Sequence, residues 1–172
     1  RPVAEVESMV QALRGLFTGD TVDADAETFG FRRARLDYGR AGIEIFLAGR
    51  GPRMTDLGGR LADGFLLSWV HRELLDGHVA SLRSAAETHD RHFTIVWSTM
   101  LVTSDADLQT ARESLSFRLP DSPDSVKAMI GMTERDTVAL REALRQGGPP
   151  AAAHLVREDW VPHFVLMGSP DG

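Results

Sequence analysis

The stretch from residue 43 to residue 69 constrains the fold most, because it contains signals for a strand, a tight turn, a helix and a second strand. Residues 43–48 read Ile-Glu-Ile-Phe-Leu-Ala, an aliphatic run typical of a buried parallel strand. Gly49-Arg50-Gly51-Pro52 follows, and proline is favoured at the first position of a helix. An amphipathic run to Ala62 leads to Asp63-Gly64 and a second aliphatic run at residues 65–68. We therefore predict a strand–turn–helix–strand unit here.

The turn in this unit has the features of an anion site. The first backbone N–H groups of a helix lack intrahelical partners, and the helix dipole favours a negative charge beside them. Gly49 and Gly51 allow close backbone approach, while Arg50 and Arg53 supply positive charge. Phosphate is the natural ligand of such a turn. From the residues alone, the alternative is a plain connecting turn with solvated arginines.

The rest of the chain continues the alternation of strands and helices. Residues 93–102 predict a third core strand and residues 163–166 a short fourth one. Apolar residues at helical spacing predict helices ending near Gly19, across residues 74–86, and after a Ser104 cap. Such alternation indicates an α/β fold with adjacent parallel strands and helices on one face.

The 172 residues predict a single domain spanning 1–172, with an excursion from the repeating unit near residues 119–150. Prolines and glycines bracket two helices in that excursion, and we interpret it as a helical insertion. The chain starts with Arg, and Ser169 begins a helix signal that is not completed. We therefore expect truncation at both ends.

Composition excludes several classes of protein. With 42% apolar and 26% charged residues, the chain has enough apolar material for a folded core. A net charge of −6 argues against a nucleic acid or an anionic membrane as partner. The absence of cysteine excludes disulfides and thiolate metal sites, and no apolar run is long enough to span a membrane. We expect a cytoplasmic protein.

Three other groups of polar residues are candidates for metal or ligand sites. The carboxylates between Asp20 and Glu27 are better explained as a solvated ribbon with a short hairpin around Phe29. His78 is expected to be a packed or boundary residue of its helix rather than a ligand. His89 and His92 lie in a turn without a well-spaced carboxylate partner. We predict no metal site.

The run from Phe46 to Trp69 resembles the luciferase-like monooxygenase family, which includes bacterial luciferase, coenzyme F420-dependent oxidoreductases and FMN-dependent monooxygenases. The resemblance is carried by an aliphatic strand, a small-residue pair, Gly-Pro, an amphipathic helix, Ala62-Asp63-Gly64 and a second aliphatic strand. The C-terminal Met167-Gly168-Ser169-Pro170-Asp171 is similar to the family's step into a late helix. The resemblance implies a partial (β/α)8 TIM barrel, because three such units cannot close a barrel of ~250 residues. It also implies that this chain is the C-terminal half of that barrel.

The resemblance also implies a cofactor site at the carboxyl ends of the strands. FMN or coenzyme F420 would place its phosphate at Ala48, Gly49, Arg50, Gly51 and Pro52. Arg50 replaces the commoner small residue, which either strengthens phosphate binding or crowds it. Met54 either contacts the cofactor tail or is a core methionine. Ser68 and Trp69 either line the ring pocket or are buried for structural reasons.

The implied function is a flavin- or F420-dependent oxidoreductase or monooxygenase acting on a small organic substrate, with hydride chemistry or oxygen activation supplied by the cofactor. The catalytic acid and base are expected outside this chain, so we name none. The alternative is a non-catalytic half-barrel or partner subunit. We expect a homo-oligomer or completion by the missing half of the barrel.

Overall fold

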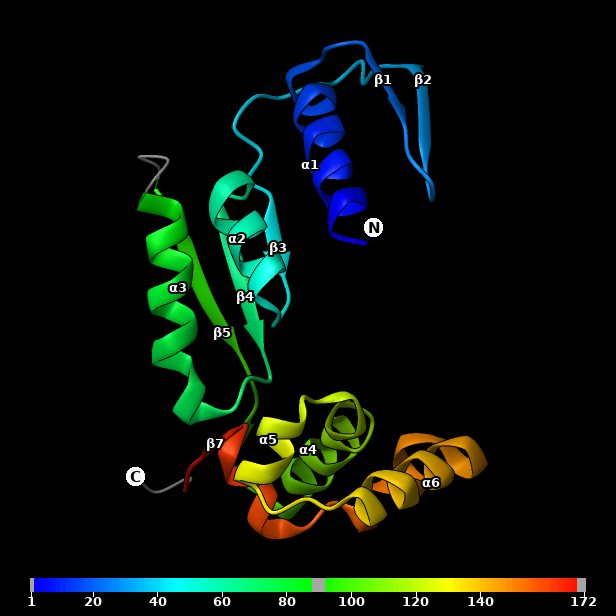
Figure 1. Ribbon diagram of the computed structural model, residues 1–172, viewed down its shortest axis with the longest axis vertical. Coiled ribbons are helices and arrows are strands. Elements are labelled where there is room, and N and C mark those ends of the chain that lie inside the picture. Colours follow the sequence, from blue (N-terminus) through cyan, green and yellow to red (C-terminus); the bar gives the residue numbers. More distant parts are fainter. Residues whose placement is uncertain (1, 88–91, 170–172) are drawn as a thin grey trace. The chain divides into compact units, whose positions relative to one another are not determined.

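The computed structural model describes residues 2–87 and 92–169 (Figure 1). Its helices are α1 (Pro2–Thr18), α2 (Pro52–Leu61), α3 (Leu75–Glu87), α4 (Asp105–Arg118), α5 (Asp124–Met129) and α6 (Glu134–Ala152). Its strands are β1 (Val22–Asp25), β2 (Gly30–Ala34), β3 (Phe46–Ala48), β4 (Gly64–Ser68), β5 (Thr94–Ser98), β6 (Leu101–Val102) and β7 (Leu166–Met167). The chain forms two compact units: a first unit of residues 1–68 and 76–97, and a second unit of residues 69–75 and 98–172.

A three-stranded sheet in the order β3-β4-β5 is the centre of the first unit. β3 and β4 are parallel, with Phe46 opposite Gly64 and Ala48 opposite Leu66. The N–H of Thr94 donates to the carbonyl of Asp63, and at the other end the N–H of Trp69 donates to the carbonyl of Ser98. β4 and β5 therefore also run in the same direction. This confirms the predicted parallel arrangement of the three strands.

Asp63 fixes the start of β4 against the chain before β3. Its carboxylate accepts a hydrogen bond from the N–H of Ile45 at 2.7 Å, and its own N–H donates to the carbonyl of Ile45 at 2.9 Å. Arg14 on α1 forms an ion pair with the same carboxylate at 2.8 Å and donates to the carbonyl of Leu61. Ile45 is thus held by the side chain of Asp63, and the hydrogen-bond ladder between β3 and β4 starts only at Phe46. The predicted strand of residues 43–48 is therefore shorter, spanning 46–48.

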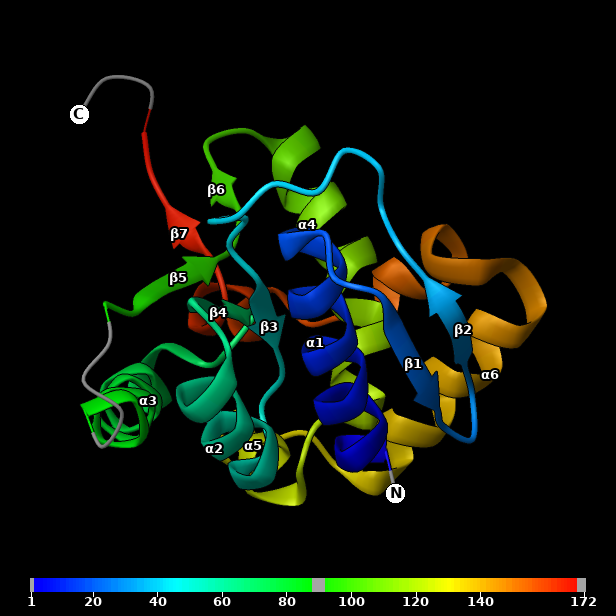
Figure 2. The same ribbon diagram turned by 90° about the horizontal axis from the view of Figure 1, so that it is seen from above.

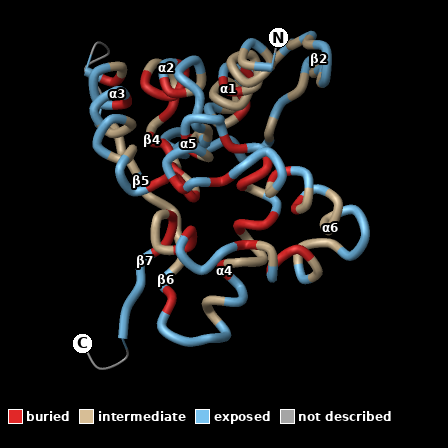
Figure 3. The backbone as a smooth tube through the Cα atoms, turned by 60° about the horizontal axis from the view of Figure 1, so that its bottom comes forward, coloured by how far each residue is buried: buried red, intermediate tan, exposed pale blue. Residues whose placement is uncertain are grey.

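Glycines let α2 approach its neighbours closely. A Cβ at Gly58 would lie 2.4 Å from the ring of Phe65 on β4, and a Cβ at Gly59 would lie 2.3 Å from Cβ of Ala85 on α3. Gly64 is equally tight, because a Cβ there would meet the Phe46 ring at 2.3 Å. Figure 2 shows α2 and α3 on the same side of the sheet. In Figure 3, the buried residues of α2 and β4 mark the core of this unit.

The N-terminal part of the first unit agrees with expectation. α1 ends before Gly19, whose φ of +83° suits glycine, and the antiparallel hairpin β1–β2 follows. The hairpin carries the tilted ring pair Phe29–Phe31, with centroids 5.6 Å apart. The carboxylate of Glu5 on α1 accepts from the N–H groups of Glu27 and Thr28 and so ties the hairpin to the helix.

The single strand predicted at residues 93–102 is wrong, because the structure has two strands there. It is divided into β5 and β6, because the chain changes neighbours at Thr99 and Met100. Thr99 Oγ1 donates to the carbonyl of Phe164, and the carbonyl of Met100 accepts from the N–H of Leu166. β6 then pairs in parallel with β7, Leu101 opposite Leu166. The predicted strand at 163–166 is displaced to Leu166–Met167, because a 3-10 helix continues to His163.

Helices make up most of the second unit. Ser104 caps α4 as predicted, its side chain accepting from the N–H of Asp107. The stretch 119–150 is helical, with α5, α6 and a kink at Gly148 (φ +70°). Its status as an insertion stays a prediction. The core is built from α4, the helices after it and the residues before β7 (Leu115, Leu119, Leu140, Trp160, Val161 and Phe164).

His89 and the helix predicted from Ser169 through Pro170 and Asp171 involve positions outside the described residues. Within the described residues, no helix is long and apolar enough to cross a membrane.

The glycine contacts of α2 make a testable prediction. Replacing Gly59 with Ala places a methyl group against Ala85, and we expect the free energy of unfolding to fall by about 1–3 kcal/mol, the usual cost of overpacking. Gly77→Ala on α3 is the control, because a Cβ there meets nothing within 4 Å. It should leave stability unchanged or raise it by up to about 1 kcal/mol through helix propensity. Urea unfolding followed by circular dichroism measures both. Equal stability of Gly59→Ala and the parent contradicts the packing account.

Candidate functional site

The turn between β3 and α2 is the candidate site. β3 ends at Ala48, and Gly51 precedes the helix in extended conformation (φ −91°, ψ 150°) with Pro52 at the first helical position. No side chain caps this helix. The carbonyl of Gly51 accepts from the N–H groups of both Met54 and Thr55 at 3.0 Å. The N–H of Arg53 makes no such bond among the described residues, so it remains available at the helix start.

The two glycines of the turn play different parts. A Cβ at Gly51 would meet nothing within 4 Å, so the space in front of this residue is open. A Cβ at Gly49 would lie 3.0 Å from Cβ of Met54. Met54 therefore packs beside the turn and is half-buried, which places it next to the candidate site rather than in the core. Close approach of a ligand is possible at Gly51, while Gly49 is needed for packing.

Positive charge gathers around the turn. Arg50 and Arg53 are exposed, and within the described residues neither forms an ion pair. The positive charge of Arg50 contributes to lowering the pKa of His78 on α3, after the larger effect of burial. Arg50 in the turn and Arg53 on α2 therefore both bring positive charge to this site.

An open pocket of about 400 Å³ adjoins the first turn of α2. Within it, Arg60 is neutralised by Asp56 at 3.1 Å and by Glu7 at 3.4 Å. Arg53 also lines it and has no such partner in the part of the chain that the structure describes. The lining residues are Val3, Ala4, Glu7, Pro52, Arg53, Asp56 and Arg60.

The carboxyl end of β4 carries the remaining predicted residues. Ser68 is half-buried in the first unit, two residues beyond Leu66, which pairs with Ala48. Trp69 belongs to the second unit, is 8% exposed and has a positive φ of 52°. The guanidinium of Arg118 lies over its ring, 4.9 Å from the centroid. The structure therefore groups Ala48–Pro52, Met54 and Ser68 in one unit and places Trp69 in the core of the other.

A histidine pair in the second unit has no role assigned by sequence reasoning. His71 is 2% exposed, and its ring stacks on His163 at 4.8 Å and meets Phe164 edge-on at 5.4 Å. Its Nδ1 accepts from the N–H of Glu73 at 3.3 Å, which places the proton of the neutral ring on Nε2. The position of His71 after the end of β4 was visible in the sequence, but its contact with His163 was not.

The pair makes a prediction about pH. Burial, reinforced by His163, lowers the pKa of His71 below its ordinary value of 6.5. The unfolded chain therefore binds a proton more readily, so the stability from neutral His71 is complete above pH 6.5 and is lost as pH falls below it. We expect this loss to reach at most about 1.4 kcal/mol per pH unit. His71→Phe should reduce the pH dependence in urea unfolding between pH 7 and pH 5. An unchanged pH profile contradicts the assignment.

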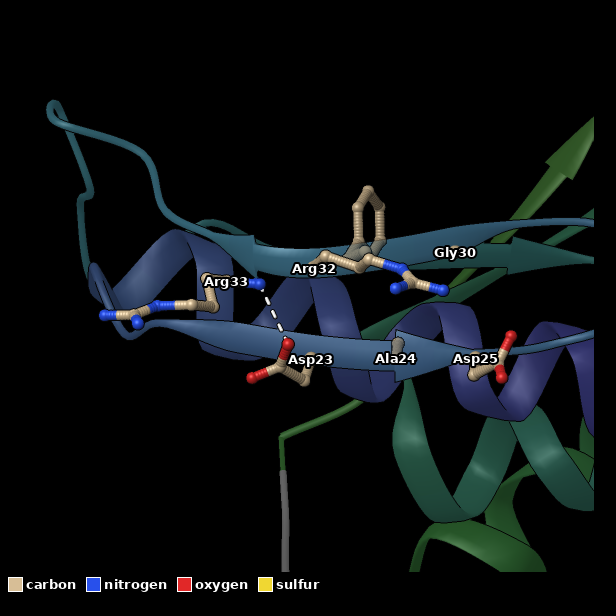
Figure 4. A pocket seen from close by; sticks show the side chains of 7 residues that line it. Asp23, Ala24, Asp25, Gly30, Arg32 and Arg33 are labelled. Atoms are coloured by element: carbon tan, nitrogen blue, oxygen red, sulfur yellow. Dashed lines mark hydrogen bonds between the residues drawn. The ribbon is translucent and has the colours of Figure 1, made fainter.

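The hairpin lines a second open hollow, of about 870 Å³, with Asp23, Ala24, Asp25, Gly30, Phe31, Arg32 and Arg33 around it. The N–H of Arg33, a residue with a φ of +46°, donates to Asp23 Oδ1 at 2.8 Å. Figure 4 shows the side chains of Arg32 and Arg33 extending toward opposite ends of the hairpin. Its charges therefore do not converge on a single ligand, unlike those at the α2 turn.

The fold and the turn define a class: an α/β protein with parallel strands alternating with helices and an anion-type turn at a strand's carboxyl end. The model of the luciferase-like monooxygenase family matches residues 1–172. The chain belongs to this family, which confirms the resemblance read from residues 46–69.

Named relatives and solved structures agree with this placement. A 5,10-methylenetetrahydromethanopterin reductase of Archaeoglobus fulgidus is 29% identical, with 99% of this chain and 54% of the relative covered. An F420-dependent glucose-6-phosphate dehydrogenase of Mycolicibacterium fortuitum is 30% identical over 98% of this chain and 48% of the relative. The coenzyme F420-dependent tetrahydromethanopterin reductase of Methanopyrus kandleri has a TM-score of 0.79 at 20% identity, with 99% of this chain and 52% of that chain covered. The chain spans about half the length of these relatives, and the last likeness shows the fold.

Proposed function

We propose that this chain supplies the phosphate site of an oxidoreductase that uses coenzyme F420. The observation that supports this most is the uncapped N-terminus of α2, which opens on free space at Gly51 directly after a parallel strand. Amides that are not otherwise bonded and a helix dipole favour an anion at such a position. Arg50 and Arg53 add charge beside it.

Coenzyme F420 is favoured over FMN by the relatives' names. The dehydrogenase of M. fortuitum and the reductase of M. kandleri are both named as F420-dependent. The same names describe reductases and dehydrogenases, which favours hydride transfer over oxygen activation. The cofactor supplies the hydride chemistry when bound, and the protein's part is to hold and orient it. The substrate is a small organic molecule.

Each residue of the turn has a distinct task in this proposal. Gly51 leaves room for the phosphate to reach the backbone, and the N–H of Arg53 donates to it. Arg50 adds a charge-assisted hydrogen bond worth about 1.5–3 kcal/mol. Pro52 sets the direction of the helix start.

The proposal extends to residues on either side of the turn. Ala48 and Ser68 lie at the carboxyl ends of adjacent strands, and Met54 packs against Gly49. We propose that these three residues flank the cofactor. A contact of Trp69 with the cofactor ring stays a prediction.

Substitutions in the turn test the proposal. The extended backbone at Gly51 accepts valine without a clash, so Gly51→Val should fold normally while its side chain fills the space of the phosphate. We expect binding of coenzyme F420 to weaken by about a hundredfold or more, equivalent to about 3 kcal/mol. Arg50→Ala should weaken it about tenfold or somewhat more, and the loss should be smaller at high salt. Fluorescence titration of F420 and of FMN measures these effects.

Arg135→Ala is the charge-matched control, because Arg135 is exposed on α6 in the second unit. It should bind as the parent does. If Gly51→Val retains the parent's affinity, or if the parent binds neither cofactor, the proposal is wrong. The non-catalytic half-barrel or partner subunit then becomes the better account.

A further inference from the structure

The segment 69–75 connects β4 to α3 but belongs to the second unit, whereas β4 and α3 belong to the first. Trp69 is part of the core of the second unit, and Leu74 packs against that core. Between these two anchors lies His71, which is 2% exposed and stacks its ring on that of His163 with centroids 4.8 Å apart. The packing of these three side chains therefore holds the segment in the second unit.

The surroundings of His71 favour its neutral ring. Nδ1 caps the 3-10 helix Arg72–Leu74 by accepting from the N–H of Glu73 at 3.3 Å, and a protonated nitrogen cannot accept this bond. Nε2 is buried and has no hydrogen-bond partner among the described residues. The protonated ring would therefore bury two N–H groups without an acceptor, which is costly. Protonation of His71 is incompatible with the place that its ring occupies.

The charges around His71 also oppose its protonation. Burial lowers the pKa of His71 below 6.5, His163 on the 3-10 helix Glu158–His163 lowers it further, and Glu73 partly offsets them. The other charged groups on the elements packed here are engaged in ion pairs or a ring contact (Glu158 with Arg112, Asp159 with Arg157, and Arg118 over Trp69). His71 is therefore neutral at pH 7.

We propose that His71 is a pH-sensitive latch: when its ring takes up a proton, the segment 69–75 leaves the core of the second unit while α4 and α6 stay folded. In the released segment the ring regains its ordinary pKa of 6.5, so opening takes up a proton. Opening is therefore suppressed above pH 6.5 and becomes up to about tenfold more favourable for each pH unit below it. Trp69 has a φ of 52°, which bulky residues rarely adopt, and release relaxes this strain.

Hydrogen exchange of the 172-residue chain, followed by mass spectrometry, measures the opening. After correction for intrinsic exchange rates, protection of the segment 69–75 should fall about five- to tenfold between pH 7.5 and pH 5.5. At pH 5.5 it should be lower than the protection of α4 and insensitive to low urea, because a local opening exposes little surface. Protection that is equal at both pH values, or that matches α4 in size and urea dependence, overturns the proposal.

Two variants assign the opening to His71. His71→Phe keeps a ring against His163 but cannot be protonated, and His71→Asn keeps an acceptor for the N–H of Glu73. In both variants, the corrected exchange of the segment should depend much less on pH. His154→Gln is the control, because His154 is exposed in the second unit, and it should retain the pH dependence of the parent. A pH dependence that persists in both His71 variants assigns the opening to another group and overturns the proposal.

Discussion

The close packing of α2 between β4 and α3 is the contact on which the candidate site depends. It is possible only because Gly58 and Gly59 present no side chain to Phe65 and Ala85. Gly64 removes the same obstacle between β3 and β4 at Phe46. Since interiors are packed at nearly crystalline density, methyl groups at these positions would move the helix. The start of α2 is therefore held in a fixed place at the end of β3.

The first backbone donors of α2 are not satisfied by a side chain of the protein and are therefore available to a ligand. Natural helices commonly begin with a serine, threonine or aspartate whose side chain satisfies the first amides. α4 and α6 follow this rule through Ser104 and Thr133, whereas α2, which begins after Gly51, and the six-residue α5 have no side-chain cap. Because α2 starts without such a cap, its first donors are available to an external anion, with Arg50 beside them.

The sequence predicted the local unit around residues 46–68 well, because its signals are local. Proline after a glycine turn and the Asp63-Gly64 pair each determine nearby backbone. The division of residues 93–102 was not predictable, because it depends on a hydrogen bond from the N–H of Leu166, far along the chain, to the carbonyl of Met100. The same holds for His71, whose surroundings depend on His163 and Phe164.

The most direct measurement of the central claim is a map of backbone amide shifts in an isotope-labelled sample as coenzyme F420 is added. If the helix start is the phosphate site, the largest changes should fall on the amides of Gly49, Gly51 and Arg53. Amides of the hairpin β1–β2 should stay unchanged. Binding of F420 that shifts the hairpin amides and leaves Gly51 and Arg53 in place would contradict the account.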